Sequence, residues 1–326
     1  MKQVQPSIIV PGGLNIDLIG LGVDRLLGEG EQTLGGILRI GPGGKARNMA
    51  QMAAAYLGPG RVAMIGRTSR DPFGLWRVPV RSLEAAGVDT SFIKILDFEE
   101  SGRKYPGVAL IPVDKKGKNQ IYVLPGSNAD FCVGDVDGAG SLFEGDGRRM
   151  MILALEIPME TAAHCIRKAA RHGIPVVLDP GGISGPIDEI LNERIFLLKP
   201  NEHEAKMLTG IPVVDGKSAD QAARKLLSMG IQNVLLTCGG EGAYLFNSES
   251  SDHIPCHAVP ETGACDETGC GDQVTAVAAS CLAEGFSIEE AARSAVLAGT
   301  LQFHRAGIQP VAKEDLARWV NDGEQK

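Results

Sequence analysis

The pattern of hydrophobic positions divides the chain at about residue 150. Beyond that point, short apolar β-branched runs alternate with amphipathic runs of helical length. Strands are expected at 151–155, 176–179, 195–199, 233–237 and 243–246, and helices at 158–172, 186–192, 202–209, 218–229, 272–284, 288–303 and 313–321. Because the strands are almost wholly apolar, helices should cover both faces of their sheet. The pattern therefore predicts an α/β fold with a mainly parallel sheet.

The first 150 residues contain two groups of strands with no helix between their members. A core strand at 7–10 precedes the first group, at 16–19 and 36–40; the second lies at 92–96, 107–113 and 120–124. A helix at 45–57 and a strand at 62–65 separate the groups. Residues 72–86 have helical periodicity, but Pro79 should kink or split that helix. We expect the two groups to form one small inserted β lobe.

Composition excludes several classes of protein. The 326 residues are 44% hydrophobic and 22% charged, which excludes a disordered chain or a coiled coil. Subtracting 40 acidic from 32 basic residues leaves a net charge of −8 with no basic cluster, so no nucleic-acid partner is expected. No apolar run is long enough to cross a membrane, so no membrane partner is expected. Seven cysteines without a C-x-x-C pair indicate a reducing compartment, and we expect a cytoplasmic protein.

The sharpest chemical signal is the segment 266–272, DETGCGD, which leads directly into a predicted helix. Gly269 and Gly271 allow a turn with exposed backbone N–H groups, and the helix start adds unpaired donors. Together these groups can hold an anion. Asp272, beside them, can take a proton from a hydroxyl while the amides stabilise a phosphoryl group. The alternative is that Asp272 only caps the helix.

A second candidate is the segment 199–204, KPNEHE, at the carboxyl end of a predicted strand. Ligands of doubly wound folds bind at that edge of the sheet. Asn201 and Glu204 lie on one face of a first helical turn, and their oxygens suit a hydrated Mg²⁺ on nucleotide phosphates. The alternative is a capped helix start.

Two further segments are rich in glycine. The turn 237–242, TCGGEG, either holds a phosphate or closes a hairpin. Asn15, Asp17 and Asn48, in the segments 12–17 and 41–48, have side chains suited to a polyhydroxylated ligand. Ordinary turn chemistry, with Asn48 exposed on its helix, is the alternative. The chain has neither a G-x-G-x-x-G fingerprint nor a P-loop, which disfavours a nicotinamide oxidoreductase.

In their order and separations, these four segments resemble the ribokinase-like sugar kinases, also called PfkB carbohydrate kinases, from about residue 7 to about residue 320. The resemblance implies a Rossmann-like α/β/α sandwich with a β lid formed by about residues 12–42 and 92–128. It also implies an enzyme that transfers the γ-phosphoryl group of ATP to a hydroxyl of a small sugar, most similar to ribose. A homodimer through the lid is a further implication.

The resemblance assigns roles to individual residues. The segment Gly269-Cys270-Gly271-Asp272 matches the family's GAGD-type motif, which implies Asp272 as the catalytic base and the loop amides as the anion hole. The implied sugar-binding residues are Asn15, Asp17, Gly43, Gly44, Lys45, Asn48 and Glu156. The implied nucleotide-binding residues are Asn201, Glu204, Thr237, Gly239, Gly240 and Gly242, with Glu204 holding Mg²⁺ through water. Asp266 and Thr268 match part of a K⁺ site that the loop 305–309 would complete.

Of the residues that depart from the family pattern, three keep alternatives open. Glu267 and Cys270 stand where small residues are usual, which leaves a sugar- or nucleotide-binding protein without catalysis as an alternative. Arg47 also replaces a small residue, and its guanidinium could bind a phosphate or carboxylate on the substrate. Other acceptors remain open: fructose, a sugar phosphate, 2-keto-3-deoxygluconate or a nucleoside. The spacing of Cys256, His257 and Cys265 fits no common zinc site.

Overall fold

The computed structural model describes residues 5–183, 187–191, 193–257 and 265–323. Within them, nine strands form one large sheet in the order β13-β12-β11-β10-β9-β8-β1-β4-β5. All neighbours are parallel except β11–β12 and β12–β13, which confirms the predicted mainly parallel sheet. The strands are β1 (Ile8–Pro11), β4 (Val62–Arg70), β5 (Ile93–Asp97), β8 (Met150–Ala154), β9 (Val176–Asp179), β10 (Leu197–Leu198), β11 (Asn233–Thr237), β12 (Ala243–Asn247) and β13 (Ser251–Ile254).

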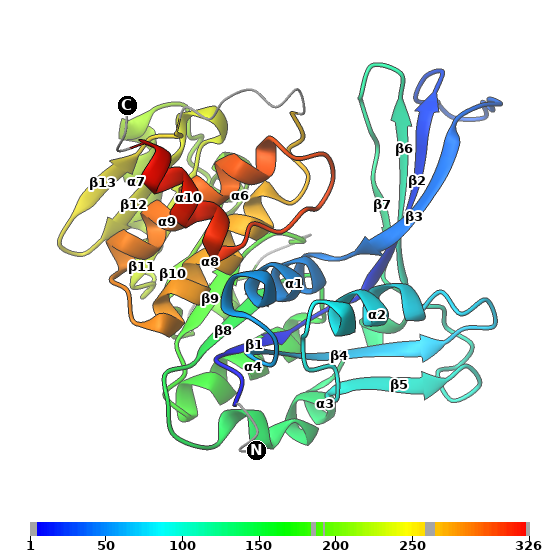
Figure 1. Cartoon of the computed structure of the whole chain (residues 1–326), viewed down its shortest axis with the longest axis horizontal. Helices are drawn as coiled ribbons and strands as arrows, with labels where there is room; N and C mark the ends of the chain where they lie inside the picture. Colours follow the sequence, from blue (N-terminus) through cyan, green and yellow to red (C-terminus); the bar gives the residue numbers. More distant parts are fainter. Residues whose placement is uncertain (1–4, 184–186, 192, 258–264, 324–326) are drawn as a thin grey trace.

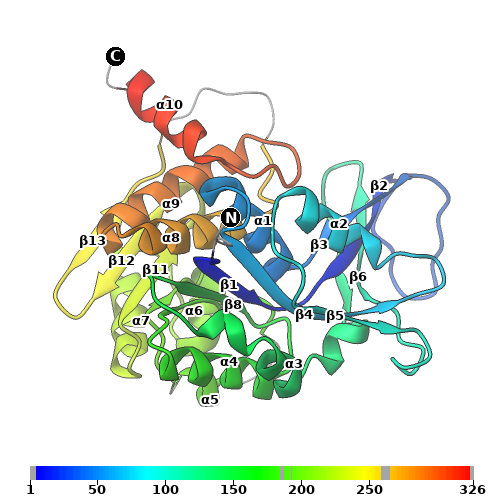
Figure 2. The ribbon, with the colours of Figure 1, turned by 60° about the horizontal axis from the view of Figure 1, so that its bottom comes forward.

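Helices cover both faces of this sheet (Figure 2). Successive residues of a strand point to opposite faces, so Ile8 and Val10 join one hydrophobic core and Ile9 joins the other. The first core includes residues of α1 (Lys45–Leu57), α2 (Arg77–Ala85), α8 (Cys270–Glu284), α9 (Ile288–Phe303) and α10 (Lys313–Gly323). The second includes residues of α3 (Val133–Gly138), α4 (Met159–Arg171), α5 (Asp188–Leu191), α6 (Glu202–Thr209) and α7 (Gly216–Ser228). This arrangement is the expected α/β/α sandwich.

A second, smaller sheet stands beside the sandwich, at the upper right of Figure 1. Its strand order is β3-β2-β6-β7, with the central β2–β6 pair parallel and both outer pairs antiparallel. The strands are β2 (Asn15–Val23), β3 (Ile37–Gly43), β6 (Gly107–Asp114) and β7 (Tyr122–Leu124). Asn15 pairs with both Gly43 and Gly107, so the small sheet begins at the residues expected to contact a sugar.

One predicted strand belongs to the other sheet. We expected 92–96 in the inserted lobe, within the lid range 92–128, but β5 pairs with the second half of β4 and extends the large sheet. We expected the strand before it to end at Ile65, because the following residues, Gly66 to Arg70, are mostly polar; β4 in fact continues to Arg70. Pairing with this extension buries Ile93 in the main core, whereas the small sheet offers little enclosed apolar volume.

Two helix starts also differ from expectation. Pro79 neither kinks nor splits a helix, because α2 begins only at Arg77 and Pro79 lies in its first turn, where backbone nitrogens need no intrahelical acceptor. Asp215, not Ser218, caps α7: the Asp215 carboxylate accepts from the Ser218 backbone N–H at 2.8 Å. Ser218 completes this capping box from inside the helix.

Three short 3₁₀ helices complete the described structure: η1 (Gly126–Asp130), η2 (Gly140–Phe143) and η3 (Gly239–Glu241). All seven cysteines lie in described segments and carry free thiols. In the described part of the chain, no helix has the length and apolar character that a bilayer crossing requires.

Candidate active site

The candidate site lies where the strand order of the large sheet reverses. The chain moves from β1 outward to β4 and β5 on one side, and then returns to add β8 on the other side of β1. Loops leave the carboxyl ends of β1 and β8 in opposite directions at such a switch point, and ligands of doubly wound folds bind in the resulting crevice. Gly12 and Gly13 follow β1, and Glu156 follows β8.

Asp272 lies in the first turn of α8 and is 5% exposed. Its Oδ2 accepts a hydrogen bond from Asn48 Nδ2 at 2.8 Å, and its Oδ1 lies 3.5 Å from Lys45 Nζ. Asn48 is therefore buried against the carboxylate and not exposed on its helix. The first turns of α1 and α8 thus bring together an acid, an amide and an ammonium group.

The loop before Asp272 presents backbone amides to the same region. Gly269 adopts a left-handed conformation (φ +77°), which glycine tolerates best, and precedes the first helical residue. The Cys270 amide already donates to the Glu267 carbonyl at 3.2 Å. The Gly271 and Asp272 amides are first-turn groups without intrahelical acceptors. Burial raises the pKa of Cys270 to about 12, so its thiol adds no charge to the loop at neutral pH.

A buried ion network that we did not predict supports this loop. Asp179, at the end of β9, is fully buried, and Lys199 Nζ lies 2.7 Å from its Oδ2. Lys45 Nζ lies 3.8 Å from the other oxygen. Burial alone would raise the pKa of Asp179, but the two ammonium groups outweigh it and hold that pKa well below its usual range. Lys199 also donates to the Gly271 carbonyl at 3.4 Å. The sequence indicated this network only by placing a charged residue, Asp179 or Lys199, at the end of each of two apolar strands.

The base of the small sheet brings the predicted sugar-binding residues together. A Cβ at Gly43 would overlap the Asp17 carboxylate, so the absence of a side chain at Gly43 leaves room for the Asp17 side chain in this position. Burial raises the pKa of Asp17. Asn128, from η1, was not among the predicted site residues, yet its Nδ2 donates to Asn15 Oδ1 at 2.7 Å. Its own Oδ1 accepts from the Leu14 N–H at 3.0 Å, so Asn128 fixes the Asn15 amide.

Glu156 is held against the start of α1. Its Oε2 accepts from the Lys45 backbone N–H at 2.9 Å, so it satisfies one of the free amides of that helix. Burial raises the pKa of Glu156, and the Lys45 amide and ammonium oppose the shift. Gly44, just before the helix, has φ +92°, and a Cβ there would lie 3.1 Å from the Asn15 backbone nitrogen. Gly44 thus lies against Asn15, and Glu156 is bonded to the start of α1 at Lys45.

Asn201 and Glu204 form a reciprocal capping box at the start of α6. Asn201 Oδ1 accepts from the Glu204 N–H at 2.8 Å, and Glu204 Oε2 accepts from the Asn201 N–H at 2.9 Å. The capped helix start that we kept as the alternative is therefore present. It engages Oε2 of Glu204 and leaves Oε1 outside the box. The Thr237 N–H donates to the Pro200 carbonyl at 2.9 Å, which holds the end of β11 beside Asn201.

The glycine turn after β11 closes the β11–β12 hairpin through η3. A Cβ at Gly242 would overlap the Ile254 carbonyl oxygen, so this glycine is needed for the turn. Gly239 and Gly240 are exposed, and their backbone is open to a ligand.

Asp266 joins the two loops that we expected around a monovalent cation. Its Oδ1 accepts from the Thr268 N–H at 2.9 Å and its Oδ2 from the Gly307 N–H at 2.7 Å. Burial would raise the pKa of Asp266, but these hydrogen bonds outweigh it and lower the pKa. Among the described residues, no cluster of three or more His, Cys, Asp or Glu side chains could hold a metal ion.

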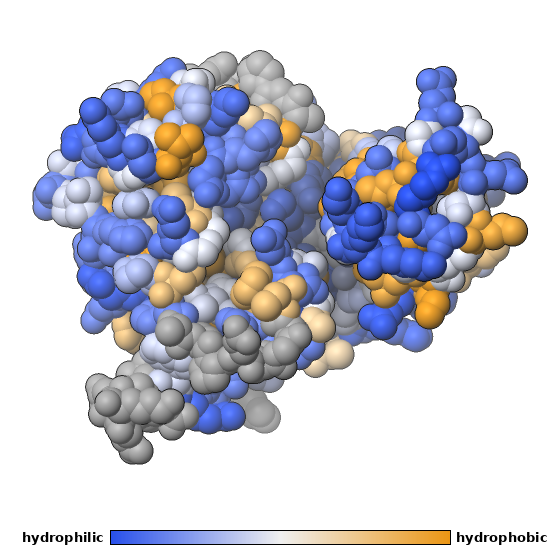
Figure 3. Space-filling model, turned by 90° about the horizontal axis from the view of Figure 1, so that it is seen from above, coloured by the Kyte–Doolittle hydropathy of each residue, from blue (hydrophilic) through white to orange (hydrophobic). Residues whose placement is uncertain are grey.

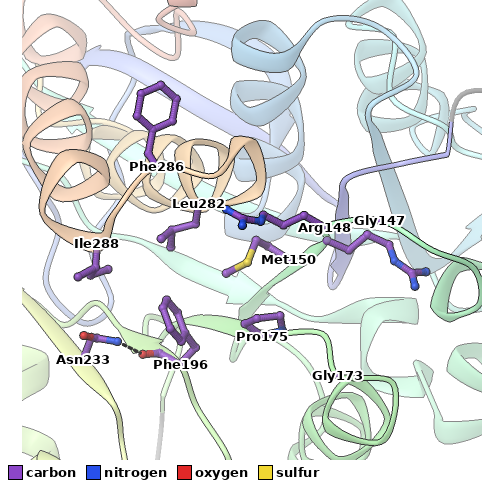
Figure 4. Close-up of a pocket in the computed structure, with 11 residues that line it drawn as sticks. Gly147, Arg148, Met150, Gly173, Pro175, Phe196, Asn233, Leu282, Phe286 and Ile288 are labelled. Atoms are coloured by element: carbon purple, nitrogen blue, oxygen red, sulfur yellow. Dashed lines mark hydrogen bonds between the residues drawn. The ribbon is translucent and has the colours of Figure 1, made fainter.

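A cavity of about 530 Å³ lies at the opposite, amino edge of the large sheet (Figure 4). Met150, Phe196 and Asn233, each at or next to the start of a strand, line it together with Leu282 of α8 and Phe286 just beyond that helix. The Asn233 amide is already engaged, because it donates to the Phe196 carbonyl at 2.9 Å. This cavity contains none of the predicted site residues.

The fold is a doubly wound α/β sandwich with a small second sheet. The family model for pfkB family carbohydrate kinases matches residues 5–315, so the chain belongs to that family. Its members are phosphotransferases with an alcohol group as acceptor, and this chain is a carbohydrate kinase.

Individual relatives cover almost the whole chain. The chain is 30% identical to the deoxyribokinase of Salmonella typhi over 303 residues, 93% of this chain and 94% of the relative. It is also 30% identical to the ribokinase of Bacillus subtilis, with the same coverage. Its structure is similar to that of Arabidopsis thaliana ribokinase complexed with ribose and ATP, with a TM-score of 0.83, 26% identity and coverage of 97% of this chain and 98% of that one.

Proposed function

We propose that this protein is an ATP-dependent pentose kinase that phosphorylates a hydroxyl group of ribose or 2-deoxyribose. The observation that carries the proposal is the buried Asp272 carboxylate at the start of α8, with Asn48 on one oxygen and Lys45 near the other. The relatives named ribokinase and deoxyribokinase support a pentose acceptor.

In the proposed mechanism, the acceptor hydroxyl lies beside Asp272 Oδ1 and loses its proton to that carboxylate as its oxygen attacks the γ-phosphorus in line. The bond from that phosphorus to the β,γ-bridging oxygen breaks, and ADP leaves. The Gly271 and Asp272 amides stabilise charge on the transferred group. Lys45, which Asp179 and Asp272 hold in its charged form by raising its pKa, adds a positive charge on the same side. No redox chemistry is needed.

On the sugar side, we propose that Asn15, Asp17, Gly43, Gly44, Asn48 and Glu156 bind the hydroxyl groups under the small sheet, which acts as the lid. Their carboxylates and amides accept and donate several hydrogen bonds each. Closure of the lid would exclude water from the phosphoryl group.

On the nucleotide side, we propose that ATP lies along the carboxyl ends of β10 and β11, against Thr237, Gly239, Gly240 and Gly242. Asn201 and Glu204 fit a hydrated Mg²⁺ there, since Glu204 Oε1 is outside the capping box and carboxylate oxygen is a preferred Mg²⁺ ligand. Bound Mg²⁺ would neutralise phosphate charge. We also propose K⁺ near Asp266 and Thr268, because the Asp266 carboxylate joins both loops of that site.

We propose a homodimer formed through the small sheet. Ile37 is 71% exposed, and further apolar side chains of this sheet are at least half exposed: Leu38, Ile40, Tyr122, Val123 and Leu124. Figure 3 shows hydrophobic surface gathered on this lobe. The outer strands β3 and β7 also have unpaired edges, which a second copy could cover. A cytoplasmic location, with free thiols and ATP supply, is part of the same proposal.

The experiment that tests the function is a panel of acceptors in a coupled ADP-release assay, run with K⁺ and with a bulky organic cation in its place. The panel contains ribose, 2-deoxyribose, fructose, fructose 6-phosphate, 2-keto-3-deoxygluconate and adenosine. We expect the highest kcat/KM with one of the two pentoses. Preference for another acceptor would overturn the pentose assignment, and binding without any phosphoryl transfer would indicate a protein that has lost catalysis.

A further inference from the structure

Arg47 is a buried cation without an acidic partner in contact. Arg47 is the third residue of α1 and is 1% exposed. None of the ion pairs among the described residues involves it. Burial lowers the pKa of Arg47 to about 10, and the charges of Asp17 and Asp272 oppose the shift. Burying a guanidinium is unfavourable unless its N–H groups are bonded, so its hydrogen bonds indicate what it does.

Both terminal nitrogens of Arg47 donate twice. Nη2 donates to the Pro42 carbonyl at 2.9 Å and to Asn48 Oδ1. Nη1 donates to Gln51 Oε1 and, at 3.5 Å, to Ser82 Oγ. Only Nε lacks a partner. The guanidinium is therefore already engaged by β3, α1 and α2, which argues against the expectation that it binds an anionic group of the substrate.

The contact with Asn48 decides which way round the Asn48 amide lies. An asparagine side chain has an oxygen that accepts and a nitrogen that donates, and the two ends have nearly the same shape. Arg47 can only donate, so it pairs only with the oxygen. The nitrogen must then point to the other neighbour, Asp272 Oδ2, which can only accept when ionised. The reverse orientation would direct the amide oxygen at the carboxylate and the amide nitrogen at the guanidinium.

We infer that Arg47 is a positioning residue for the catalytic base: it orients the Asn48 amide, which in turn holds Asp272 Oδ2 and leaves Oδ1 facing the acceptor hydroxyl. This inference rests on the proposed function of Asp272. Because Nη2 also bonds Pro42 at the end of β3, the same nitrogen connects the base of the small sheet to this orientation.

The test is a double-mutant cycle on kcat with the best acceptor of the panel. Arg47→Met keeps the apolar stem and removes every donor. We expect it to lower kcat by about 10–100-fold, because a reacting group that is misplaced by about 1 Å can slow the reaction by about 100-fold. The KM for ATP should change little. Asn48→Ala should lower kcat as well. In the double variant, loss of Arg47 should add little once the amide is gone, since the two residues act as one unit.

A matched control is Arg67→Met. Arg67 is also largely buried, with Nε donating to Asp135 at 2.7 Å, but its partner lies in α3 and not at the site. It should lower the thermal unfolding midpoint and leave kcat of the folded protein unchanged. Independent losses from Arg47→Met and Asn48→Ala, or parental kcat in folded Arg47→Met, would overturn the inference. So would a loss confined to the KM of phosphorylated or carboxylated acceptors, which would assign Arg47 to substrate binding.

A crystal structure of Arg47→Met separates this inference from the proposed function. A rotated Asn48 side chain, or an Asp272 carboxylate that has left it, supports the positioning role whether or not the parent protein phosphorylates a pentose. An unchanged contact between Asn48 Nδ2 and Asp272 Oδ2 contradicts it. If the parent transfers no phosphoryl group to any acceptor, the proposed function is wrong, and the crystal structure still decides whether Arg47 orients Asn48.

Discussion

Asn48 Nδ2 and Asp272 Oδ2 lie 2.8 Å apart although 224 residues separate them in the chain. The contact exists because α1 and α8 pack on the same face of the large sheet, with fully buried alanines such as Ala53 and Ala276 in their shared core. Small side chains allow two helices to approach closely. The first turns of both helices then meet at the carboxyl edge of the sheet, where an acid is held by an amide from another helix.

Asp272→Asn should abolish most activity while keeping the fold. Asparagine has nearly the same shape and can still accept from Asn48 Nδ2, but it cannot take a proton from the acceptor. We expect kcat to fall by about 10²–10⁴-fold, measured by ADP release. The control is Asp135→Asn, which loses the charge paired with Arg67 and should lower stability without changing kcat. Near-parental turnover of folded Asp272→Asn would remove Asp272 from the role of base.

Gly43→Ala should damage sugar binding. Its Cβ would overlap the Asp17 carboxylate, so that side chain must move away from the sugar side. We expect the KM for the acceptor to rise by about tenfold or more, since one lost hydrogen bond to a charged group is worth about 1.5–3 kcal/mol. Gly41→Ala on the same strand is the control, because a Cβ there meets no atom within 4 Å. Equal KM values for the two variants would show that Asp17 does not contact the acceptor.

Lys199→Met should destabilise the fold. It leaves the fully buried Asp179 with only Lys45, at 3.8 Å, as a counter-charge. Removing one partner of a buried ion pair costs about 3–5 kcal/mol, so urea unfolding should show a loss of that order. Lys313→Met breaks a partly exposed pair with Glu284 and should cost less than about 1 kcal/mol. Similar losses of unfolding free energy in the two variants would contradict a large contribution of the Asp179 network to stability.

The same carboxylate predicts a pH dependence of stability. The pKa of Asp179 is lower in the folded state than in the unfolded state, so at acidic pH the folded state binds fewer protons at this carboxylate than the unfolded state does. The resulting stabilisation is present above the unfolded pKa, about 4, and is lost as the pH falls below it. In urea titrations across this range, Asp179→Asn should lose less unfolding free energy on acidification than the parent. Parallel curves would assign the acid sensitivity to other carboxyl groups.

Leu38→Lys combined with Val123→Lys should prevent dimer formation. Both side chains are at least half exposed on the small sheet, and a charge at a buried interface position is costly. Sedimentation velocity should show a dimer for the parent and a monomer for the variant. Val214→Lys, at an exposed apolar position just before α7 and outside the small sheet, should leave the parental state unchanged. A parent that sediments as a monomer at micromolar concentration would contradict the proposed homodimer.

Local patterns predicted the elements whose burial is regular. The helices Lys45–Leu57, Glu202–Thr209 and Ile288–Phe303 agree with expectation at both ends, because apolar positions repeat at helical spacing. A glycine follows each of the first two, and a serine N-cap precedes the third. The strand β5 was assigned to the wrong sheet. A short strand carries no information about its partner, and the polar half of β4 that pairs with it has no hydrophobic pattern.

The site could be predicted only in part, for a similar reason. Asp272, Asn48 and Lys45 stood in recognisable motifs, whereas Asp179 and Asn128 did not. Lys199 stood in a candidate segment, but nothing there indicated its pairing with Asp179, since these roles come from neighbours distant in the chain. Arg47 looked like an anion ligand in the sequence, but its contacts turn it toward Pro42 and Asn48.

The amino-acid sequence by itself determined the mainly parallel sheet, most of its helices, the four strands of the small sheet and the residue types that carry the chemistry, because these follow from hydrophobic period and from local backbone requirements. Only the tertiary structure decided which side chains share a hydrogen bond. A buried carboxylate, amide or guanidinium must find a partner of the right kind wherever packing brings one within reach, and that partner is set by how helices and strands meet in space.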